Sequence, residues 1–154
     1  MTLQPGDSAP DFDLPSDGGG HVRLADFKGK RLVLYFYPKD DTSGCTSEAQ
    51  AFTAAAADFK AAGAAVVGVS KDSVKSHDKF KAKYELIFPL GADTEGAAVE
   101  AYGVWVEKSM YGRKYMGIER ATYLIDGAGR IAKVWRKVKV AGHAADVLKA
   151  VKEA

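Results

Sequence analysis

Cys45 is the residue of this sequence whose type and surroundings point most directly to covalent chemistry. It is the only cysteine among 154 residues, and a loop rich in threonine, serine and glycine precedes it. A free thiol has a pKa of about 8.5, so it is mostly protonated at neutral pH, and only the thiolate is a nucleophile. We expect a helix to begin at this point, and the unpaired N–H groups and axial dipole of a helix start stabilise an anion. Cys45 is therefore a candidate nucleophile.

Three neighbours of Cys45 suit a small site around a thiolate. Thr42 places a hydroxyl three residues before the sulfur, where it can donate a hydrogen bond to the sulfur or to a substrate oxygen. Gly44 lets the backbone approach a bound small molecule, and Pro38 would shield the pocket from water without adding a donor. A lone cysteine is more often a small buried hydrophobe, but such a residue belongs in an apolar strand or helix stripe rather than in a polar loop.

The elements that must position these residues follow from the hydrophobic pattern. Residues 31–37 are apolar at almost every position, which predicts a central strand buried on both faces. Residues 46–62 carry apolar side chains at helical spacing, and residues 64–69 predict a second strand, so the three elements form a parallel right-handed unit. Further elements expected are a helix over 73–84, an apolar stretch over 86–90, a short helix ending near Gly103, a hairpin of strands 121–125 and 130–136, and a last helix from about 141 to 152.

The order of these elements predicts an α/β protein with a mixed central sheet flanked by helices, which is the order of the thioredoxin-like fold. Residues 12–14 and 22–24 surround a glycine-rich turn and predict an added N-terminal β-hairpin. Residues 104–119 mix aromatic, charged and glycine residues without a period, which predicts an irregular loop packed over the rest of the protein. We expect residues 1–154 to form one domain.

Composition excludes several classes of partner. Lys and Arg number 22 and Asp and Glu 20, for a net charge of +2, and there is no long block of like charge, so a nucleic-acid partner is not expected. No apolar run approaches the roughly 20 residues that cross a bilayer, so no membrane partner is expected either. A single cysteine cannot form an internal disulfide, and the opening residues read as a domain start rather than a leader, so we expect a cytoplasmic, reducing compartment.

The other residues that could take part in binding or catalysis give weaker indications of a function. The histidines are far apart in sequence, without ligand-like spacing, so a metal site with Cys45 is not expected and surface or capping positions are; they are His21, His77 and His143. Packing of the irregular loop is the expected role of its large side chains, with lining of a pocket mouth as the alternative; these are Trp105, Met110, Tyr111 and Tyr115. Lysine and arginine alternate with valine over 133–140, which is typical of a solvated strand face or edge.

The segment from Pro38 to Cys45 resembles the Pro-x-x-x-Thr-x-x-Cys signature of peroxiredoxins. The wider Tyr-Phe-Tyr-Pro-Lys-Asp together with Gly-Cys-Thr is similar to the bacterioferritin-comigratory, or Q-type, branch of that family. The resemblance extends over nearly the whole chain and includes the opening residues 6–12, the strand end 68–70 with Ser76-His77, the segment 108–112, and residues 117–120 before a strand.

The resemblance implies that Cys45 is the peroxidatic residue, which attacks a hydroperoxide oxygen and becomes a sulfenic acid, without a cofactor. Arg120 matches the second active-site position, where a guanidinium holds the thiolate and the charge developing on the breaking O–O bond. Thr42 would position the peroxide, Pro38 would shield the pocket, and Glu48 could orient an arginine. Without the resemblance, Arg120 would read as a surface arginine at a strand entry and Glu48 as a carboxylate that stabilises a helix start.

The chain departs from the family at the resolving cysteine. Gln50 and Lys81 occupy the two positions where Q-type members place it, and Ser43 stands where proline is common. The resemblance therefore implies a one-cysteine mechanism, in which an external thiol reduces the sulfenic acid. We expect the protein to be a monomer. Candidate reductants are thioredoxin, glutaredoxin with glutathione, and a second protein chain.

Three other functions compete with a thiol peroxidase. A thiol-disulfide oxidoreductase would need a second cysteine where Glu48 stands. A glutathione peroxidase differs from this sequence around the cysteine. A peroxide-sensing or chaperone-like module would use Cys45 oxidation as a signal and turn over little, so steady-state peroxide consumption separates it from a peroxidase.

Overall fold

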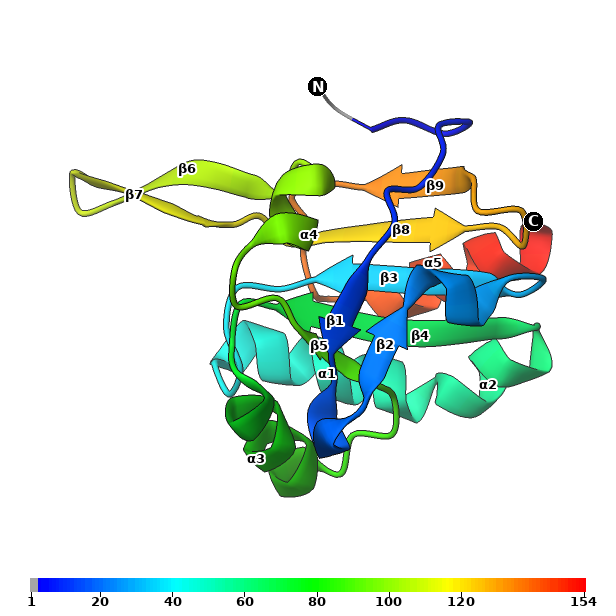
Figure 1. The fold of residues 1–154 in the computed structure, drawn as a ribbon, viewed down its shortest axis with the longest axis horizontal. Helices are drawn as coiled ribbons and strands as arrows, with labels where there is room; N and C mark the ends of the chain where they lie inside the picture. The colour runs from blue at the N-terminus through cyan, green and yellow to red at the C-terminus, as the bar shows by residue number, and fades with distance from the viewer. Residues whose placement is uncertain (1–2) are drawn as a thin grey trace.

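A five-stranded mixed sheet forms the centre of the computed structural model, which describes residues 3–154. The strand order is β5-β4-β3-β8-β9 (Figure 1), and the strands span Arg31–Phe36 (β3), Ala64–Ser70 (β4), Leu90–Ala92 (β5), Ala121–Ile125 (β8) and Ile131–Trp135 (β9). β3 pairs in parallel with β4, which pairs in parallel with β5, and β3 is antiparallel to β8, which is antiparallel to β9. The expected mixed sheet is confirmed, and the basic segment 133–140 begins on the edge strand β9 and continues into the loop after it.

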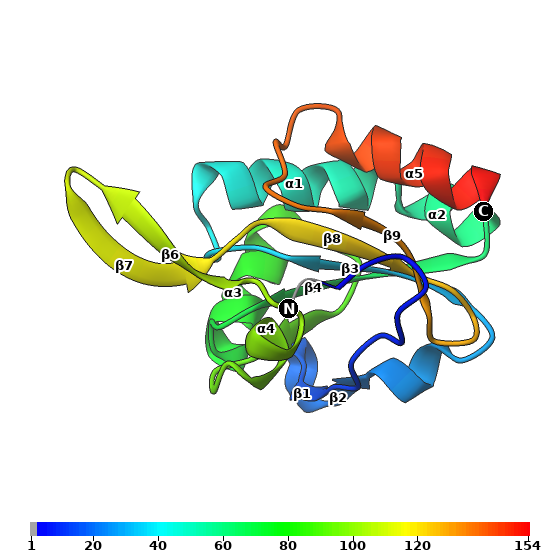
Figure 2. The ribbon, with the colours of Figure 1, turned by 90° about the horizontal axis from the view of Figure 1, so that it is seen from above.

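Helices cover both faces of this sheet. Helices α1 (Ser43–Ala54), α2 (Ala56–Ala61) and α5 (His143–Glu153) lie on one face (Figure 2). The other face carries α4 (Ala97–Ala101) and the N-terminal hairpin of β1 (Asp13–Pro15) and β2 (His21–Arg23), while α3 (Val74–Tyr84) contacts β5 at the sheet edge. Two short 3-10 helices, at Asp17–Gly19 and Leu24–Phe27, complete the N-terminal part. The predicted N-terminal hairpin is thus present, and the helices of residues 3–154 are all too short or too polar to cross a bilayer.

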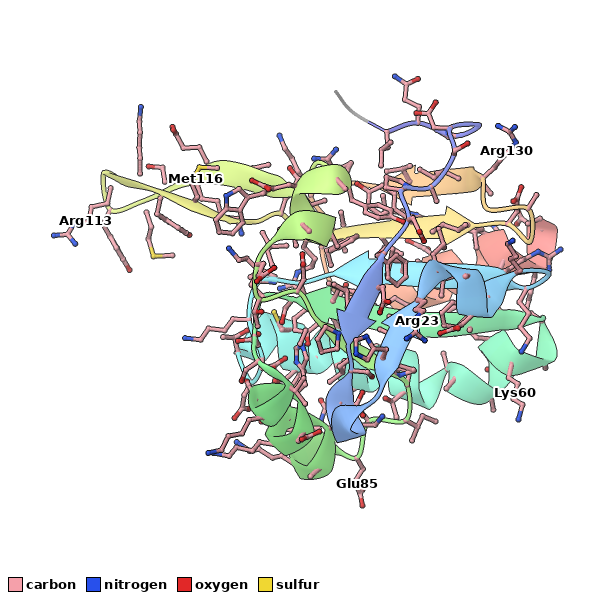
Figure 3. The ribbon with its side chains drawn as sticks, in the orientation of Figure 1. Arg23, Lys60, Glu85, Arg113, Met116 and Arg130 are labelled. Carbon is pink, nitrogen blue, oxygen red and sulfur yellow. The ribbon has the colours of Figure 1, made fainter. Side chains whose placement is uncertain are left out.

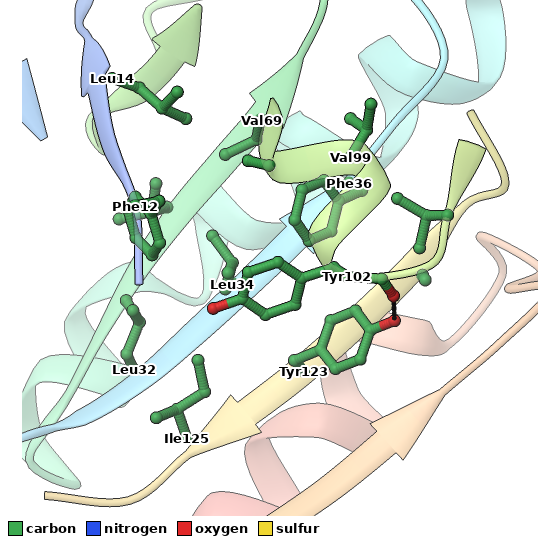
Figure 4. Close-up of a cluster of buried hydrophobic side chains, with 14 of the residues drawn as sticks. Phe12, Leu14, Leu32, Leu34, Phe36, Val69, Val99, Tyr102, Tyr123 and Ile125 are labelled. Carbon is green, nitrogen blue, oxygen red and sulfur yellow. Dashed lines mark hydrogen bonds between the residues drawn. The ribbon is translucent and has the colours of Figure 1, made fainter. Parts of the chain in front are cut away.

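Strand β3 is buried on both faces because its side chains alternate between two apolar clusters. Leu32, Leu34 and Phe36 face the cluster beneath α4 and the N-terminal hairpin. Figure 4 shows this cluster, in which the Tyr123 hydroxyl donates to the Tyr102 carbonyl at 2.7 Å. Val33, Tyr35 and Tyr37 face the helices on the other side and pack in the same cluster as Cys45. The loop that carries Thr42 and leads to Cys45 therefore leaves a strand that is buried on both faces.

The helix expected over residues 46–62 differs from the observed structure in two ways. It begins three residues earlier, at Ser43, and it changes direction at Ala55, which separates α1 from α2. α1 packs against α5, whereas α2 also packs against β4, so the break lets the two segments follow different neighbours. The earlier start moves Cys45 from the loop into the first turn of α1.

The prediction of an irregular loop over residues 104–119 is wrong. These residues form an antiparallel hairpin of β6 (Trp105–Met110) and β7 (Arg113–Ile118), which projects from the sheet (Figure 1). Its turn residues Tyr111 and Gly112 have φ values of 53° and 77°, the left-handed conformation of a two-residue type I′ turn. The hairpin lacks the alternation of a surface strand because most of its side chains are exposed or half-buried on both faces.

Candidate active site

Cys45 is the third residue of α1, and its sulfur lies against the apolar cluster below the helix. Thr42 is the N-cap residue, and the first backbone hydrogen bond of the helix runs from the Thr46 N–H to the Thr42 carbonyl at 2.8 Å. The N–H groups of the three residues before Thr46 precede this ladder, so their partial positive charge surrounds the side chain of Cys45. The residue is only 2% exposed. An anion on Sγ is therefore stabilised by a helix start in a nearly closed site.

The guanidinium of Arg120 approaches Cys45 from the neighbouring strand. Arg120 directly precedes β8, and Phe36 at the end of β3 pairs with Ala121 at the start of β8, so the sheet register brings Arg120 to the edge where the Cys45 loop begins. Arg120 Nη2 donates to Cys45 Sγ at 3.3 Å. Burial opposes the charge of Arg120, but the negative charges of Glu48 and Cys45 outweigh it and raise the pKa of Arg120. The arginine is a cation held directly on the sulfur.

Glu48 holds the other side of the same guanidinium. It follows Cys45 by three residues on α1, which places both side chains on one helix face. Arg120 Nη1 donates to Glu48 Oε1 at 2.7 Å, whereas Glu48 Oε2 is buried without a hydrogen-bond partner in residues 3–154. Burial raises the pKa of Glu48 to about 7, and the attraction of Arg120 offsets only part of that effect. Burial thus disfavours the charged form of Glu48, and the ion pair with Arg120 favours it.

Gly44 leaves the room that the arginine occupies. A Cβ atom at this position would lie 3.1 Å from Arg120 Nη2, closer than most real Cβ contacts. The backbone of Gly44 is helical and has no left-handed φ, so the space and not the conformation explains why glycine fits here. The structure therefore brings Cys45, Gly44, Glu48 and Arg120 into one contact group.

Thr42 and Pro38 belong to the segment between β3 and Cys45, and the hydrogen bond described for the Thr42 side chain is not to the sulfur. The Thr42 hydroxyl donates to the Lys39 carbonyl at 2.8 Å, which bridges the turn that leads into α1. Its oxygen keeps lone pairs that can accept a hydrogen bond. Pro38 is half-buried and lines a surface depression next to the base of the β6–β7 hairpin.

A buried polar network beneath the active-site loop was not predicted. Asp40 accepts hydrogen bonds from the Tyr37 hydroxyl at 2.6 Å, from Ser76 Oγ at 2.8 Å and from His77 Nδ1 at 2.7 Å. The second ring nitrogen of His77 lies 2.9 Å from the Gly91 carbonyl. Burial lowers the pKa of His77, but its hydrogen bond and attraction to Asp40 outweigh this, so the pKa is raised. The network ties the loop before Cys45 to α3.

The expectation of surface or capping positions for all three histidines is therefore wrong. His77 is fully buried, and His143 is buried with its Nε2 2.8 Å from Thr122 Oγ1; only His21 is exposed, next to Asp13. A signal for His77 existed, because it falls three residues before Phe80 on the inward stripe of α3. Asp40, Asp72 and His77 bring three potential metal-binding atoms within 4.8 Å of one another, but Asp72 accepts from Ser70 Oγ and from the Asp40 N–H, so the group is already satisfied by protein donors.

Comparisons with known proteins show the family to which the chain is similar. Residues 5–134 match the model of the AhpC/TSA family. Peroxiredoxin Bcp of Bacillus subtilis is 50% identical over 153 residues, which cover 99% of this chain and 98% of that protein. The solved structure of Xanthomonas campestris peroxiredoxin Q superposes with a TM-score of 0.90 at 48% identity, covering 98% of this chain and 96% of that one.

Further structures of the Xanthomonas campestris protein bear on two details. One, with a TM-score of 0.90 at 47% identity and coverage of 98% of this chain and 96% of that one, comes from a study of its alkyl peroxide reduction activity. Two others carry serine in place of one or another cysteine, and the positions of those cysteines differ by 36. Lys81 follows Cys45 by the same number of positions, so lysine stands at the spacing of the second cysteine.

Proposed function

This chain belongs to the AhpC/TSA family as a peroxiredoxin of the Bcp, or Q-type, branch, a class of thiol-dependent peroxidases with a thioredoxin-like fold, and we propose that Cys45 is its peroxide-reducing residue. One observation carries the proposal: the only thiol of the chain sits in the first turn of a helix, with a guanidinium nitrogen 3.3 Å from its sulfur. Hydrogen peroxide and organic hydroperoxides are the proposed substrates.

The chemistry follows from the charges around Sγ. The thiolate attacks one peroxide oxygen, the O–O bond breaks, and the departing oxygen takes up a proton and leaves as water or an alcohol. Cys45 becomes a sulfenic acid. Arg120 stabilises the thiolate and the negative charge that develops on the two oxygens, because its five N–H donors serve the sulfur, Glu48 and a substrate at once.

The remaining site residues support this step. Glu48 fixes the direction of the Arg120 guanidinium through the 2.7 Å hydrogen bond, so it is a positioning residue. The Thr42 hydroxyl donates to Lys39, so its oxygen is free to accept a hydrogen bond from the peroxide O–H. Gly44 admits the guanidinium, and Pro38 shields the approach to the sulfur from water.

The cycle closes with an external thiol. The chain has one cysteine, so no second cysteine of the same chain can resolve the sulfenic acid, and a reductant such as thioredoxin, glutaredoxin with glutathione, or another small thiol must do so. A reducing, cytoplasmic compartment would supply such thiols. We further infer that residues 1–154 act as one domain, because the two apolar clusters share β3. A monomer is the proposed state of this domain.

Trapping of the sulfenic acid tests the proposal. After one equivalent of hydrogen peroxide, a sulfenic-acid reagent should add once per wild-type chain at Cys45 by peptide mass spectrometry, and the Cys45→Ser variant should show no adduct. Repeated peroxide consumption with added thiol identifies a peroxidase, whereas a single oxidation that no thiol reverses would identify a sensor. A wild-type protein that consumes no peroxide with any thiol would refute the function.

A further inference from the structure

A shallow depression of about 370 Å³ lies beside the active site, at the base of the β6–β7 hairpin. Trp105, Tyr115 and Met116 supply large apolar surfaces to it, and Figure 3 shows that Met116 belongs to the projecting hairpin. Two lysines also line it and add positive charge: Lys71 from the segment after β4 and Lys108 from β6. Its remaining lining includes Pro38, at the start of the loop to Cys45, and Ile118, two residues before Arg120. The depression is therefore lined by residues of both chain segments that lead to the catalytic group, the one before Cys45 and the one before Arg120.

The two lysines are half-buried and carry no compensating carboxylate. The lysines that form ion pairs in residues 3–154 are Lys81, Lys83, Lys114 and Lys149, so Lys71 and Lys108 are not among them. Lys71 Nζ lies 4.1 Å from the centre of the Trp105 ring, a cation–π contact that holds the ammonium group over the depression. The nearest acidic residue in sequence to Arg120, Glu119, is paired with Arg136. The two lysines thus bring positive charge to the depression, and neither is among the ion-paired lysines of residues 3–154.

The charges of Arg120 and Cys45 also affect the pKa of Lys108. Burial is the largest influence on Lys108 and lowers its pKa, and the positive charge of Arg120 lowers it further, while Cys45 and Glu119 act in the opposite direction. Repulsion between two cations at the edge of a closed site is relieved when an anion lies between or beside them. A bound carboxylate would supply that anion.

We propose that this depression binds the carboxylate groups of a small anionic thiol, a short peptide thiol of the glutathione class, and delivers it to the Cys45 sulfenic acid. The inference rests on the proposed peroxidase function. The lysines complement the carboxylates, and the faces of Trp105 and Tyr115 receive the apolar parts of the peptide. Because Cys45 is only 2% exposed, a slender thiol needs less displacement of the surrounding chain than a folded protein thiol does.

The reduction balances with two molecules of this thiol. The sulfur of the first thiol attacks Cys45 Sγ, an S–S bond forms, the S–O bond of the sulfenic acid breaks, and the hydroxyl leaves with the thiol proton as water. The second thiol attacks the sulfur of the bound first thiol and releases the thiol of Cys45. The two small thiols are oxidised to one disulfide, and the sulfenic acid is reduced.

A thiol series of different charge tests the inference. Cys45 sulfenic acid is formed with one equivalent of hydrogen peroxide and mixed with glutathione, neutral 2-mercaptoethanol or cationic cysteamine, and each rate is expressed per thiolate so that thiol acidity cancels. The proteins compared are wild type, Lys71→Gln/Lys108→Gln, and Lys114→Gln as the control. Lys114 lies on the same hairpin but outside the depression, is 76% exposed and faces Glu107 at 3.7 Å.

Wild type should prefer glutathione, and the double variant should lower the glutathione-to-mercaptoethanol ratio by about fivefold to tenfold, the loss of two favourable ion pairs. Lys114→Gln should leave that ratio unchanged, and salt should lower it only in wild type and the control. An unchanged ratio in the double variant overturns the inference. So does a wild-type rate per thiolate that is no higher for glutathione than for 2-mercaptoethanol or cysteamine. If no sulfenic acid forms, or no thiol reverses it, the proposed function itself has failed.

Discussion

Arg120 Nη2 lies 3.3 Å from Cys45 Sγ, although the two residues are 75 positions apart in the chain. The contact depends on the pairing of Phe36 with Ala121, because Arg120 directly precedes Ala121 and the loop that leads to Cys45 leaves the sheet after Phe36. Glu48 then fixes the guanidinium from the helix that carries the cysteine. The site is thus assembled by the junction of a parallel and an antiparallel strand pair.

Substitution of Arg120 should slow the reaction of Cys45 with peroxide. Arg120→Gln removes the charge on the sulfur and should lower the second-order rate constant by about 100-fold, the typical effect of losing one preorganised donor. Arg120→Lys keeps a positive charge but loses the forked geometry, so its rate constant should lie between those of wild type and Arg120→Gln. Stopped-flow mixing with hydrogen peroxide measures both, and a glutamine variant as fast as wild type would contradict the assigned role.

Gly44→Ala separates the position of the arginine from its charge. The added Cβ would lie 3.1 Å from Arg120 Nη2, so the guanidinium should shift by a few tenths of an ångström and its hydrogen bond to the sulfur should weaken. Since alanine favours a helix more than glycine does, the variant should be at least as stable as wild type while its peroxide rate constant falls by about tenfold. Thermal unfolding and stopped-flow kinetics measure the two quantities, and an unaltered rate constant would show that the contact is dispensable.

The sequence predicts the buried parts of this protein better than its exposed parts. The strands β3, β4 and β8 follow from apolar runs because burial on both faces leaves little choice of residue. The β6–β7 hairpin escaped prediction because neither of its faces is buried enough to impose a period, and Tyr111-Gly112 is not the usual Asn-Gly turn.

The site residues also differ in how well the local sequence predicts them. Cys45 follows from its local context, whereas Arg120 could be assigned only through a family resemblance, since nothing local marks a residue that acts through sheet register. The helix start was placed three residues late because Ser43 and Gly44 are weak helix formers, although the first turn tolerates them. The network of Asp40 and His77 was missed because it joins a loop to a helix 37 positions away.

Glu48 should make the stability of the protein depend on pH. Its pKa is raised to about 7 by burial, from an ordinary value of 4.5, so the folded state binds the proton more tightly than the unfolded state does. The stabilisation is fully present below pH 4.5 and is lost as the pH rises through 7. Glu48→Gln cannot titrate, so its stability relative to wild type should rise by about 3 kcal/mol between pH 4.5 and 7.5. Urea unfolding at several pH values measures this, and parallel curves for the two proteins would exclude it.

The buried ion pair of Asp40 and His77 should contribute more to the free energy of unfolding than the exposed ion pair of Asp13 and His21. Asp40→Asn leaves a buried histidine without its carboxylate and should cost about 3 kcal/mol of unfolding free energy at pH 6. The pKa of His77 is raised, so this contribution is fully present below about pH 6.5 and is lost as the pH rises through the folded value.

The matched control for that pair is Asp13→Asn. His21 and Asp13 meet at the same 2.7 Å, but their side chains are 48% and 53% exposed. The control should lose far less stability at pH 6. Urea unfolding at pH 6 and 8.5 compares the two variants, and equal losses would show that burial does not set the strength of the Asp40 pair.

Steady-state peroxide consumption by wild type and Cys45→Ser tests the central claim most directly. Both proteins are supplied with hydrogen peroxide and, in separate reactions, with thioredoxin, glutaredoxin with glutathione, or a small dithiol. Wild type should turn over repeatedly with at least one of these reductants, and the serine variant with none, because the chain has no other thiol to form a sulfenic acid. Residual turnover by the Cys45→Ser variant would contradict the assignment of the nucleophile.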